Sequence, residues 1–134
     1  MKSHSKIIDR IIEIIGHSHS ICVAGHVRPD GDCIGSQVGL SLALRKQGKE
    51  IFCWNEDIVP QKYAFLDPDH LLRKPAGQRA FDLVICTDCA SFERLGKVGP
   101  AAVKRKSLIN IDHHQSNTRY GDVIWISARE ASTG

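Results

Sequence analysis

Acidic and imidazole side chains gather in three short clusters, each directly after an apolar run. The clusters are residues 26–32 (His-Val-Arg-Pro-Asp-Gly-Asp), Asp88, and residues 112–114 (Asp-His-His). The apolar runs before them are residues 21–24, 81–86 and 108–111. Residues just past the carboxyl ends of strands in an open α/β sheet converge on one crevice. Carboxylates that meet there repel one another unless cations lie among them, so the clusters predict a divalent metal site, and a pair of metals rather than one.

The first cluster would form the loop between a strand and the helix that follows it. His26 and Asp30 lie in this loop, and Asp30 and Asp32 are spaced so that they aim at neighbouring positions. A helix that begins near Asp32 would also offer free N–H groups and its positive dipole end to a phosphate. Imidazole combined with carboxylate suits manganese, iron or zinc, whereas carboxylate alone would favour magnesium.

Asp88 follows the apolar run at residues 81–86 and could bridge two metals through its two carboxylate oxygens. An isolated Asp at this position is more often a helix cap or a turn residue. The same placement after a strand occurs three times in this chain, and that repetition favours the ligand.

The triplet Asp112-His113-His114 places two histidines side by side on a loop. Both cannot easily face one metal, so one is expected to bind metal while the other contacts phosphate or acts as a general acid. Two metals about 3.5–4 Å apart would activate water and clamp the phosphoryl oxygens, which indicates a hydrolytic phosphoesterase. A nucleophilic mechanism through Cys33 or Cys89 is weaker, because it gives the carboxylates no role.

Composition is compatible with this chemistry. The chain has 134 residues, 42% hydrophobic and 25% charged, and a net charge of +3, which is typical of one globular domain. The mild charge suits a small anionic substrate, with Arg28, Arg119 and the basic run at 104–106 near the clusters, although such a run is more often a solvated surface. No G-x-G-x-x-G motif follows the first strand, so a dinucleotide cofactor is not indicated.

Five cysteines occur without a regular framework. Cys22, Cys53 and Cys86 lie inside apolar runs, where reduced cysteine behaves as a small hydrophobe. Cys33 and Cys89 each neighbour a candidate ligand, but the chain has no CxxC pair, so spacing disfavours zinc ligation. The sequence shows no signal peptide and no membrane span, and we expect a reducing, cytoplasmic compartment with no membrane partner.

The elements that must position these residues alternate between strands and helices. We predict a helix over 5–15, whose isoleucines form a stripe, a second helix over 32–47 and a short one over 60–66. Strands are predicted at 20–25, 50–54, 81–87, 108–111 and 122–126. This alternation predicts an α/β fold with a doubly wound, mainly parallel sheet of about five strands flanked by helices. Residues 127–134 look like the start of a further helix.

These motifs resemble those of the DHH phosphoesterase superfamily, which is named for the triplet seen here at 112–114. The resemblance also covers the loop around residues 25–36, Thr87-Asp88 and the closing Ala-Ser-Thr-Gly at 131–134, and so spans about the whole chain. It is strongest to the branch of bacterial oligoribonucleases, or nanoRNases, that also dephosphorylate 3′-phosphoadenosine 5′-phosphate.

The resemblance implies a role for each site residue. His26 and Asp30 would hold one Mn²⁺, Asp32 and His113 would hold the second, and Asp88 would bridge the two ions, with Mg²⁺ or Co²⁺ as alternatives. His114 would touch the scissile phosphate, and Asp112 would support the histidines. We also expect substrate contacts from two further residues of the first loop and helix, Arg28 and Ser36.

The resemblance also implies an Mn²⁺-dependent hydrolase of short oligoribonucleotides or 3′-phosphoadenosine 5′-phosphate. Residues 1–134 would be the N-terminal part of the catalytic domain, without the family's fourth Asp motif and its C-terminal substrate-binding domain. That missing domain would be a partner of this chain, and a homodimer is an option. Two alternatives stay open: a hydrolase of the inorganic pyrophosphatase or exopolyphosphatase type, and a non-catalytic module that binds metal or nucleotide.

Overall fold

The computed structural model describes the backbone of residues 2–134 and the side chains from Ser5 onward, and its centre is one six-stranded sheet. In chain order the strands are β1 (Ser20–Ala24), β2 (Glu50–Trp54), β3 (Leu72–Arg73), β4 (Phe81–Thr87), β5 (Arg105–Asp112) and β6 (Val123–Ile126). Across the sheet the order is β3-β2-β1-β4-β5-β6, and all neighbouring pairs are parallel. The predicted α/β fold with a doubly wound parallel sheet is confirmed.

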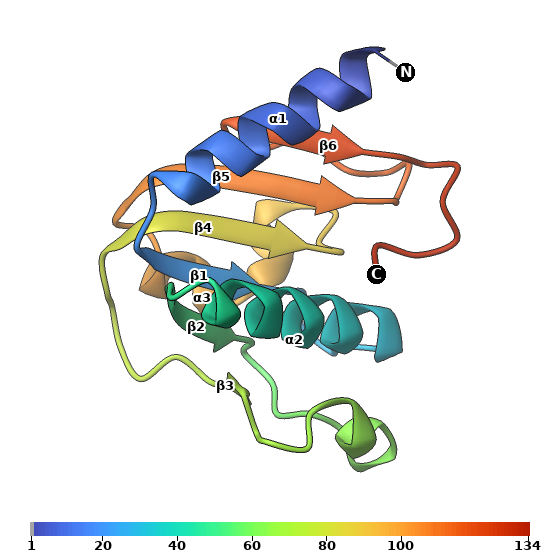
Figure 1. The fold of residues 1–134 in the computed structure, drawn as a ribbon. Coiled ribbons are helices and arrows are strands. Elements are labelled where there is room, and N and C mark those ends of the chain that lie inside the picture. Colours follow the sequence, from blue (N-terminus) through green and yellow to red (C-terminus); the bar gives the residue numbers. More distant parts are fainter. Residues whose placement is uncertain (1) are drawn as a thin grey trace.

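Helices cover both faces of this sheet. The two long helices, α1 (Lys2–Gly16) and α2 (Gly31–Lys46), lie on the same face, α1 across β5 and β6 and α2 beside β1 and β2 (Figure 1). Two short helices, η2 (Phe92–Leu95) and α3 (Val98–Ala101), cover the opposite face. A third short helix, η1 (Gln61–Leu66), packs beside α2. The chain thus crosses from one face to the other after β4.

The sequence pattern explains how these layers pack. In α1, Ile7, Ile11, Ile14 and Ile15 share one side of the helix and pack on the sheet, as their helical spacing requires. Strand β4 is buried on both faces and therefore reads as a continuous apolar run. Its Leu83 and Ile85 pack in the layer under α1 and α2, whereas Val84 and Cys86 face η2 and α3.

Several predicted boundaries differ from the observed ones. Strand β5 begins at Arg105 rather than 108. Its polar first residues are part of the strand because Arg105 pairs with Phe81 of β4 and Ser107 pairs with Leu83. The sheet has six strands rather than about five, since the two-residue β3 pairs only with the end of β2. The predicted start of a helix at 127–134 is wrong, because this segment forms turns whose last amides bond to Asp32.

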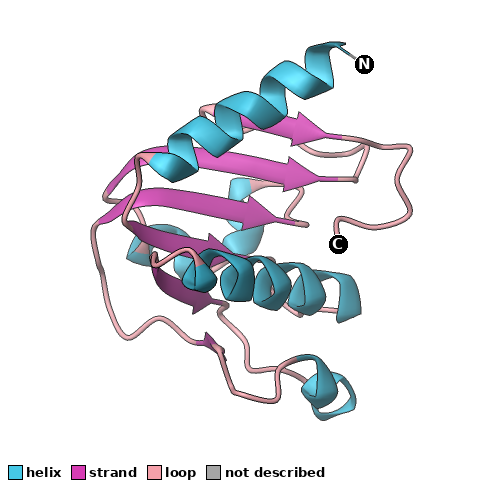
Figure 2. Ribbon diagram, viewed as in Figure 1, coloured by secondary structure: helices cyan, strands magenta, loops and turns pink. Residues whose placement is uncertain are grey.

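The topology decides where a site can form. The strand order reverses between β1 and β4, and ligands in such sheets bind in the crevice beyond the carboxyl ends of the strands at that point. The loops that leave β1, β4 and β5 all lie at this edge (Figure 2). Among the described residues, no helix is long and apolar enough to cross a membrane.

Candidate metal centre

The three clusters meet at the carboxyl edge of the sheet, as predicted. Asp88 follows β4 at the centre, between the loop that leaves β1 and the triplet that ends β5. It is buried, with 1% of its surface exposed, and its φ of 58° lies in the left-handed region. Asp and Asn tolerate this conformation better than most residues, and here it turns the carboxylate back toward both neighbouring loops.

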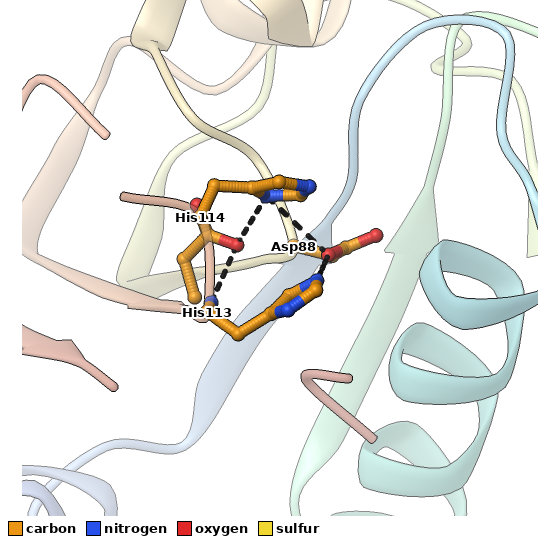
Figure 3. A group of neighbouring side chains, drawn as sticks. Asp88, His113 and His114 are labelled. Carbon is orange, nitrogen blue, oxygen red and sulfur yellow. Dashed lines mark hydrogen bonds and ion pairs between the residues drawn. The ribbon is translucent and has the colours of Figure 1, made fainter. Parts of the chain in front are cut away.

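The two oxygens of Asp88 face different histidines. Oδ2 lies 3.4 Å from His26 Nε2, and Oδ1 lies 3.2 Å from His113 Nε2 and 3.7 Å from His114 Nδ1. The rings of His113 and His114 are both turned toward the carboxylate (Figure 3). The hydroxyl of Thr133 also donates to Oδ1 at 3.0 Å. Asp88 therefore stands between two groups of candidate ligands.

The loop after β1 supplies the first group. His26 directs Nδ1 to its neighbour's carbonyl, Val27 O at 2.7 Å, which leaves Nε2 for Asp88 and for Asp30 Oδ1 at 3.8 Å. Asp30 caps α2 by accepting from the Cys33 N–H at 2.9 Å. Its side chain is nevertheless 60% exposed, so this carboxylate serves the helix and still opens toward solvent at the site.

Asp32, in the first turn of α2, belongs to the second group, although it lies only two residues after Asp30. Its Oδ2 lies 3.2 Å from His113 Nε2, and Oδ1 accepts from Ser36 Oγ at 3.1 Å. The amides of Thr133 and Gly134 also donate to this carboxylate. The last two residues of the chain thus fold back onto the first turn of α2, a contact that sequence reasoning did not anticipate.

Asp112 orients the two histidines that follow it. Its Oδ1 accepts from the His113 backbone N–H at 2.8 Å and contacts His114 Nδ1 at 2.7 Å. Its Oδ2 accepts from Asn117 Nδ2 at 2.9 Å. The Asp112 side chain is fully enclosed, whereas that of His114 is 41% exposed, so the fixed carboxylate holds a ring whose other nitrogen is free to meet a ligand.

Two buried amide pairs hold these loops, and sequence reasoning missed both. Asn55 donates to His26 O at 2.9 Å and to Gln37 Oε1 at 3.2 Å, and Gln37 Nε2 donates to the carbonyls of β1 and β2. On the other side, Asn110 and Asn117 exchange hydrogen bonds at 2.9 and 3.1 Å beneath Asp112. The available signal was an amide directly after β2 and another inside β5.

The two residues predicted to contact substrate, Arg28 and Ser36, differ in exposure: Arg28 is exposed and Ser36 is buried. Arg28 is exposed and has a φ of 52°, and its backbone N–H donates to Asp57 Oδ2 at 2.7 Å. Ser36 is 8% exposed and its hydroxyl donates to Asp32 Oδ1, so it steadies a candidate ligand, and its contact with substrate stays a prediction.

The charges of the cluster are strongly coupled. Asp88 raises the pKa of His26 to about 11, and Cys33 adds to this rise. Burial would raise the pKa of Asp32, but the amides of Thr133 and Gly134 outweigh it and hold the pKa below its usual value. The cluster thus combines a carboxylate kept ionised with an imidazole that keeps its proton, and a metal ion that bound here would replace that proton.

The donor atoms fit a divalent cation. Asp88, Asp112, His113 and His114 offer ligand atoms within 4.8 Å of one another, and so do His26, Cys33 and Asp88. Asp88 belongs to both sets, so one buried carboxylate joins two groups of donors. A cavity of about 230 Å³ lies beside His113 and residues 132–134, and another of about 400 Å³ lies between residues 133–134 and the first half of α2. A larger cavity, about 580 Å³, lies at the β2–β3 edge away from this chemistry.

The fold and the site define an α/β domain with a mixed imidazole and carboxylate cluster at the switch point of its sheet. Residues 20–134 match the model of the DHH family, N-terminal domain. The chain therefore belongs to the DHH family.

Curated relatives extend this assignment. Bifunctional oligoribonuclease and PAP phosphatase NrnA of Thermus thermophilus is 34% identical over 119 residues, which cover 84% of this chain and 33% of that protein. The protein of the same name from Bacillus subtilis is 33% identical over 127 residues, which cover 91% of this chain and 38% of that protein. The chain thus spans little more than a third of the length of these relatives.

A solved structure agrees in fold. An exopolyphosphatase-related protein from Bacteroides fragilis superposes with a TM-score of 0.82, over 99% of this chain and 41% of that one. The sequence identity is 21%, so this likeness concerns the arrangement of the strands and helices and not the substrate.

Proposed function

We propose that this chain is the metal-binding catalytic part of a phosphoesterase that hydrolyses short oligoribonucleotides and 3′-phosphoadenosine 5′-phosphate. The observation that carries the proposal is Asp88, a buried carboxylate whose two oxygens face His26 and His113 from opposite sides. A carboxylate in this position costs free energy unless cations or donors compensate it. The histidines and the neighbouring acids are the donors that a pair of divalent ions requires.

The proposed ligand sets follow this division. His26 and Asp30 would hold one ion, Asp32 and His113 would hold the other, and Asp88 would contact both. Mn²⁺ suits a mixed imidazole and carboxylate set, and Mg²⁺ or Co²⁺ are alternatives. Such ions, when bound, neutralise phosphate charge and lower the pKa of a coordinated water. The Asp32 carboxylate would be ready to bind an ion, because the hydrogen bonds that it accepts from the amides of Thr133 and Gly134 lower its pKa and keep it ionised.

His114 and Asp112 would act on the substrate side of the cluster. Asp112 Oδ1 engages His114 Nδ1 at 2.7 Å, which fixes the ring and leaves Nε2 to donate to a phosphate oxygen or to the leaving group. The second partner of Asp112, Asn117, prevents the carboxylate from turning away. Arg28, which is exposed in the loop between β1 and α2, would meet a further phosphate of the substrate.

The substrate class rests on the relatives named as oligoribonuclease and PAP phosphatase. Both are far longer than the part matched here, and we propose that residues 1–134 are the N-terminal part of the DHH catalytic domain. In this proposal, a fourth Asp-containing motif and a C-terminal substrate-binding domain belong to the remainder of the protein. They would complete the second metal site and hold the distal end of the substrate.

Hydrolysis of three substrates with added Mn²⁺ tests the proposal. A diribonucleotide, 3′-phosphoadenosine 5′-phosphate and pyrophosphate are offered to this chain and to a form extended by the C-terminal remainder of a relative. We expect the first two to be hydrolysed, at least by the extended form, and EDTA to abolish the reaction. The Asp88→Asn variant should be inactive, while Asp69→Asn, which changes an exposed acid outside the cluster, should match the wild type.

The other outcomes either favour one of the two alternative functions or refute the assignment of the metal centre. Preferential hydrolysis of pyrophosphate would favour the pyrophosphatase or exopolyphosphatase type over the oligoribonuclease type. Mn²⁺ binding without hydrolysis of any of the three by the extended form would favour a binding module. Full activity of Asp88→Asn would refute the assignment of the centre.

A further inference from the structure

The cavity at the β2–β3 edge of the sheet lies apart from the metal centre. It has a volume of about 580 Å³ and lies where β3 pairs with only the last two residues of β2. Its walls come from the end of α2, from β2 and from residues 69–73, which lead into β3. Pockets of this volume hold small organic ligands in other proteins, and no residue of the candidate metal centre lines this one.

Two arginines line this cavity without a carboxylate partner. Arg45, in the last turn of α2, and Arg73, in β3, are both exposed. In the described part of the chain, no carboxylate oxygen lies within 4.0 Å of either guanidinium, whereas Arg79 pairs with Glu50 of β2 at 3.1 Å. Of the described residues, only Asp69 adds an acid to the lining. The cavity therefore has an excess of positive charge that favours an anion.

The segment before β3 is held firmly beside the cavity. The buried Asp67 carboxylate accepts from the N–H groups of Leu71 and Leu72 at 2.8 and 2.9 Å. His70, which lines the cavity, has a left-handed φ of 54°, an uncommon value for a residue other than Gly. Its carbonyl oxygen accepts from Arg73 Nε at 3.3 Å. This bond positions the guanidinium and leaves its two terminal nitrogens to donate to a ligand.

The edge of β2 adds a backbone donor to the cavity. Successive residues of a strand direct their N–H and C=O groups to opposite neighbours. The Asn55 N–H donates to Arg73 O on the β3 side, so Ile51, an even number of residues earlier, also faces the β3 side. Because β3 reaches only the last two residues of β2, the Ile51 N–H has no acceptor among the described residues. This N–H therefore faces the cavity that Ile51 lines.

We propose that this cavity binds a phosphate-bearing small molecule of about the size of a nucleoside monophosphate. Guanidinium groups form paired hydrogen bonds with phosphate oxygens, and the Ile51 N–H adds a further donor. Phe52 and Leu71 offer apolar surface to the organic part of the ligand. A strand of another chain fits less well, because Ile51 alone in β2 has peptide groups open to a new strand. The inference does not depend on the proposed metal centre.

Nuclear magnetic resonance can locate such a ligand directly. The protein is kept in EDTA, so that no metal ion holds phosphate at the candidate centre. It is titrated with adenosine 5′-monophosphate and, separately, with inorganic phosphate. The Ile51 amide and the Arg73 Nε–H report on the cavity, while the amides of Asp88 and His113 report on the candidate metal centre.

Three variants separate specific binding from a general effect of charge. Arg73→Gln removes a proposed ligand contact, and Asp69→Asn removes the acid that would repel the phosphate. Arg10→Gln is the matched control, because it removes the same charge as Arg73→Gln from an exposed position on α1.

We expect adenosine 5′-monophosphate to shift the Ile51 and Arg73 signals saturably, and inorganic phosphate to bind more weakly. Arg73→Gln should weaken binding of the nucleotide by at least about tenfold, as the loss of a charge-assisted hydrogen bond predicts, while Arg10→Gln keeps the wild-type affinity. Asp69→Asn should raise the affinity about two- to fivefold. A variant that had lost its fold could not produce this gain.

Four results would overturn the proposal. The first is the absence of a saturable shift at Ile51 with millimolar nucleotide, or shifts confined to Asp88 and His113. The second is an equal loss of affinity in Arg73→Gln and Arg10→Gln, which would indicate a general effect of charge. The third is equal affinity for inorganic phosphate and the nucleotide, which would remove the organic part of the ligand. The fourth is a dimer in sedimentation whose formation shifts the Ile51 amide, which would place a second copy of the chain at this edge.

Discussion

Replacing Asp88 by Asn tests the centre of the cluster without disturbing its backbone. The φ of 58° at this position strains Ala, so Asp88→Ala would combine a conformational cost with the loss of charge. Asn tolerates the left-handed region and can keep accepting from Thr133 Oγ1 through its carbonyl oxygen. The Asn variant therefore removes the negative charge and little else.

The size of the effect follows from His26. Asp88 is the largest cause of the rise in the pKa of His26 from 6.5 to about 11. A rise of this size corresponds to on the order of 6 kcal/mol in favour of the protonated ring. A folded-state pKa above the unfolded one stabilises the protein in full below pH 6.5, and this contribution is lost as the pH rises toward 11. In Asp88→Asn the pKa should fall by several units and most of this pH dependence should disappear.

Two measurements on the metal-stripped protein check this prediction. Nuclear magnetic resonance follows the imidazole signals of His26 across the pH range, and urea unfolding gives the free energy of unfolding at each pH. The wild type should lose stability relative to the variant between pH 6.5 and 11. Asp69→Asn, an exposed acid elsewhere, should reproduce the wild-type curve.

One result would refute the reasoning. If the pKa of His26 in Asp88→Asn stayed within about one unit of the wild-type value, the proton would be held by another partner. Asp88 would then not be the charge that links the two halves of the site, and the argument for a pair of ions would lose its main support.

Three further predictions concern the surroundings of the site. Asn117→Ala should lower the free energy of unfolding by about 3 kcal/mol in urea, because the buried Asp112 carboxylate and the Asn110 amide each lose a partner; an unchanged midpoint would contradict the network. The pKa of Asp82 is lowered to about 2 by two backbone N–H groups at the start of β1. The stabilisation is therefore present above pH 3.8 and is lost as the pH falls through 2, and Asp82→Asn should unfold with a weaker pH dependence in this window. His114→Ala should reduce turnover by about 10²-fold while the metal content, measured on the purified protein, stays the same; loss of metal instead would exchange the proposed roles of the two histidines.

The sequence determined the elements and the donor types of this site. The isoleucine stripe of α1 has helical spacing, and the apolar run of β4 has the length of a buried strand. Strands that alternate with helices restrict the sheet to parallel pairing. Residues that follow the strands therefore had to lie at one edge, which is why His26, Asp88 and His113 could be placed together before any contact was known.

The tertiary structure alone decided how these residues are held. Asn55 and Asn117 are ordinary polar residues in the sequence, and only burial beside His26 O and Asp112 makes them supports of the site. The return of Thr133 to Asp32 joins residues about a hundred positions apart, which no local pattern encodes. Cys33 resembles any core cysteine by spacing, and its polar surroundings arise from Gln37, one helical turn later, together with the loop after β2. Local periodicity fixes which face of an element is buried, but partners distant in the sequence fix which atoms meet there.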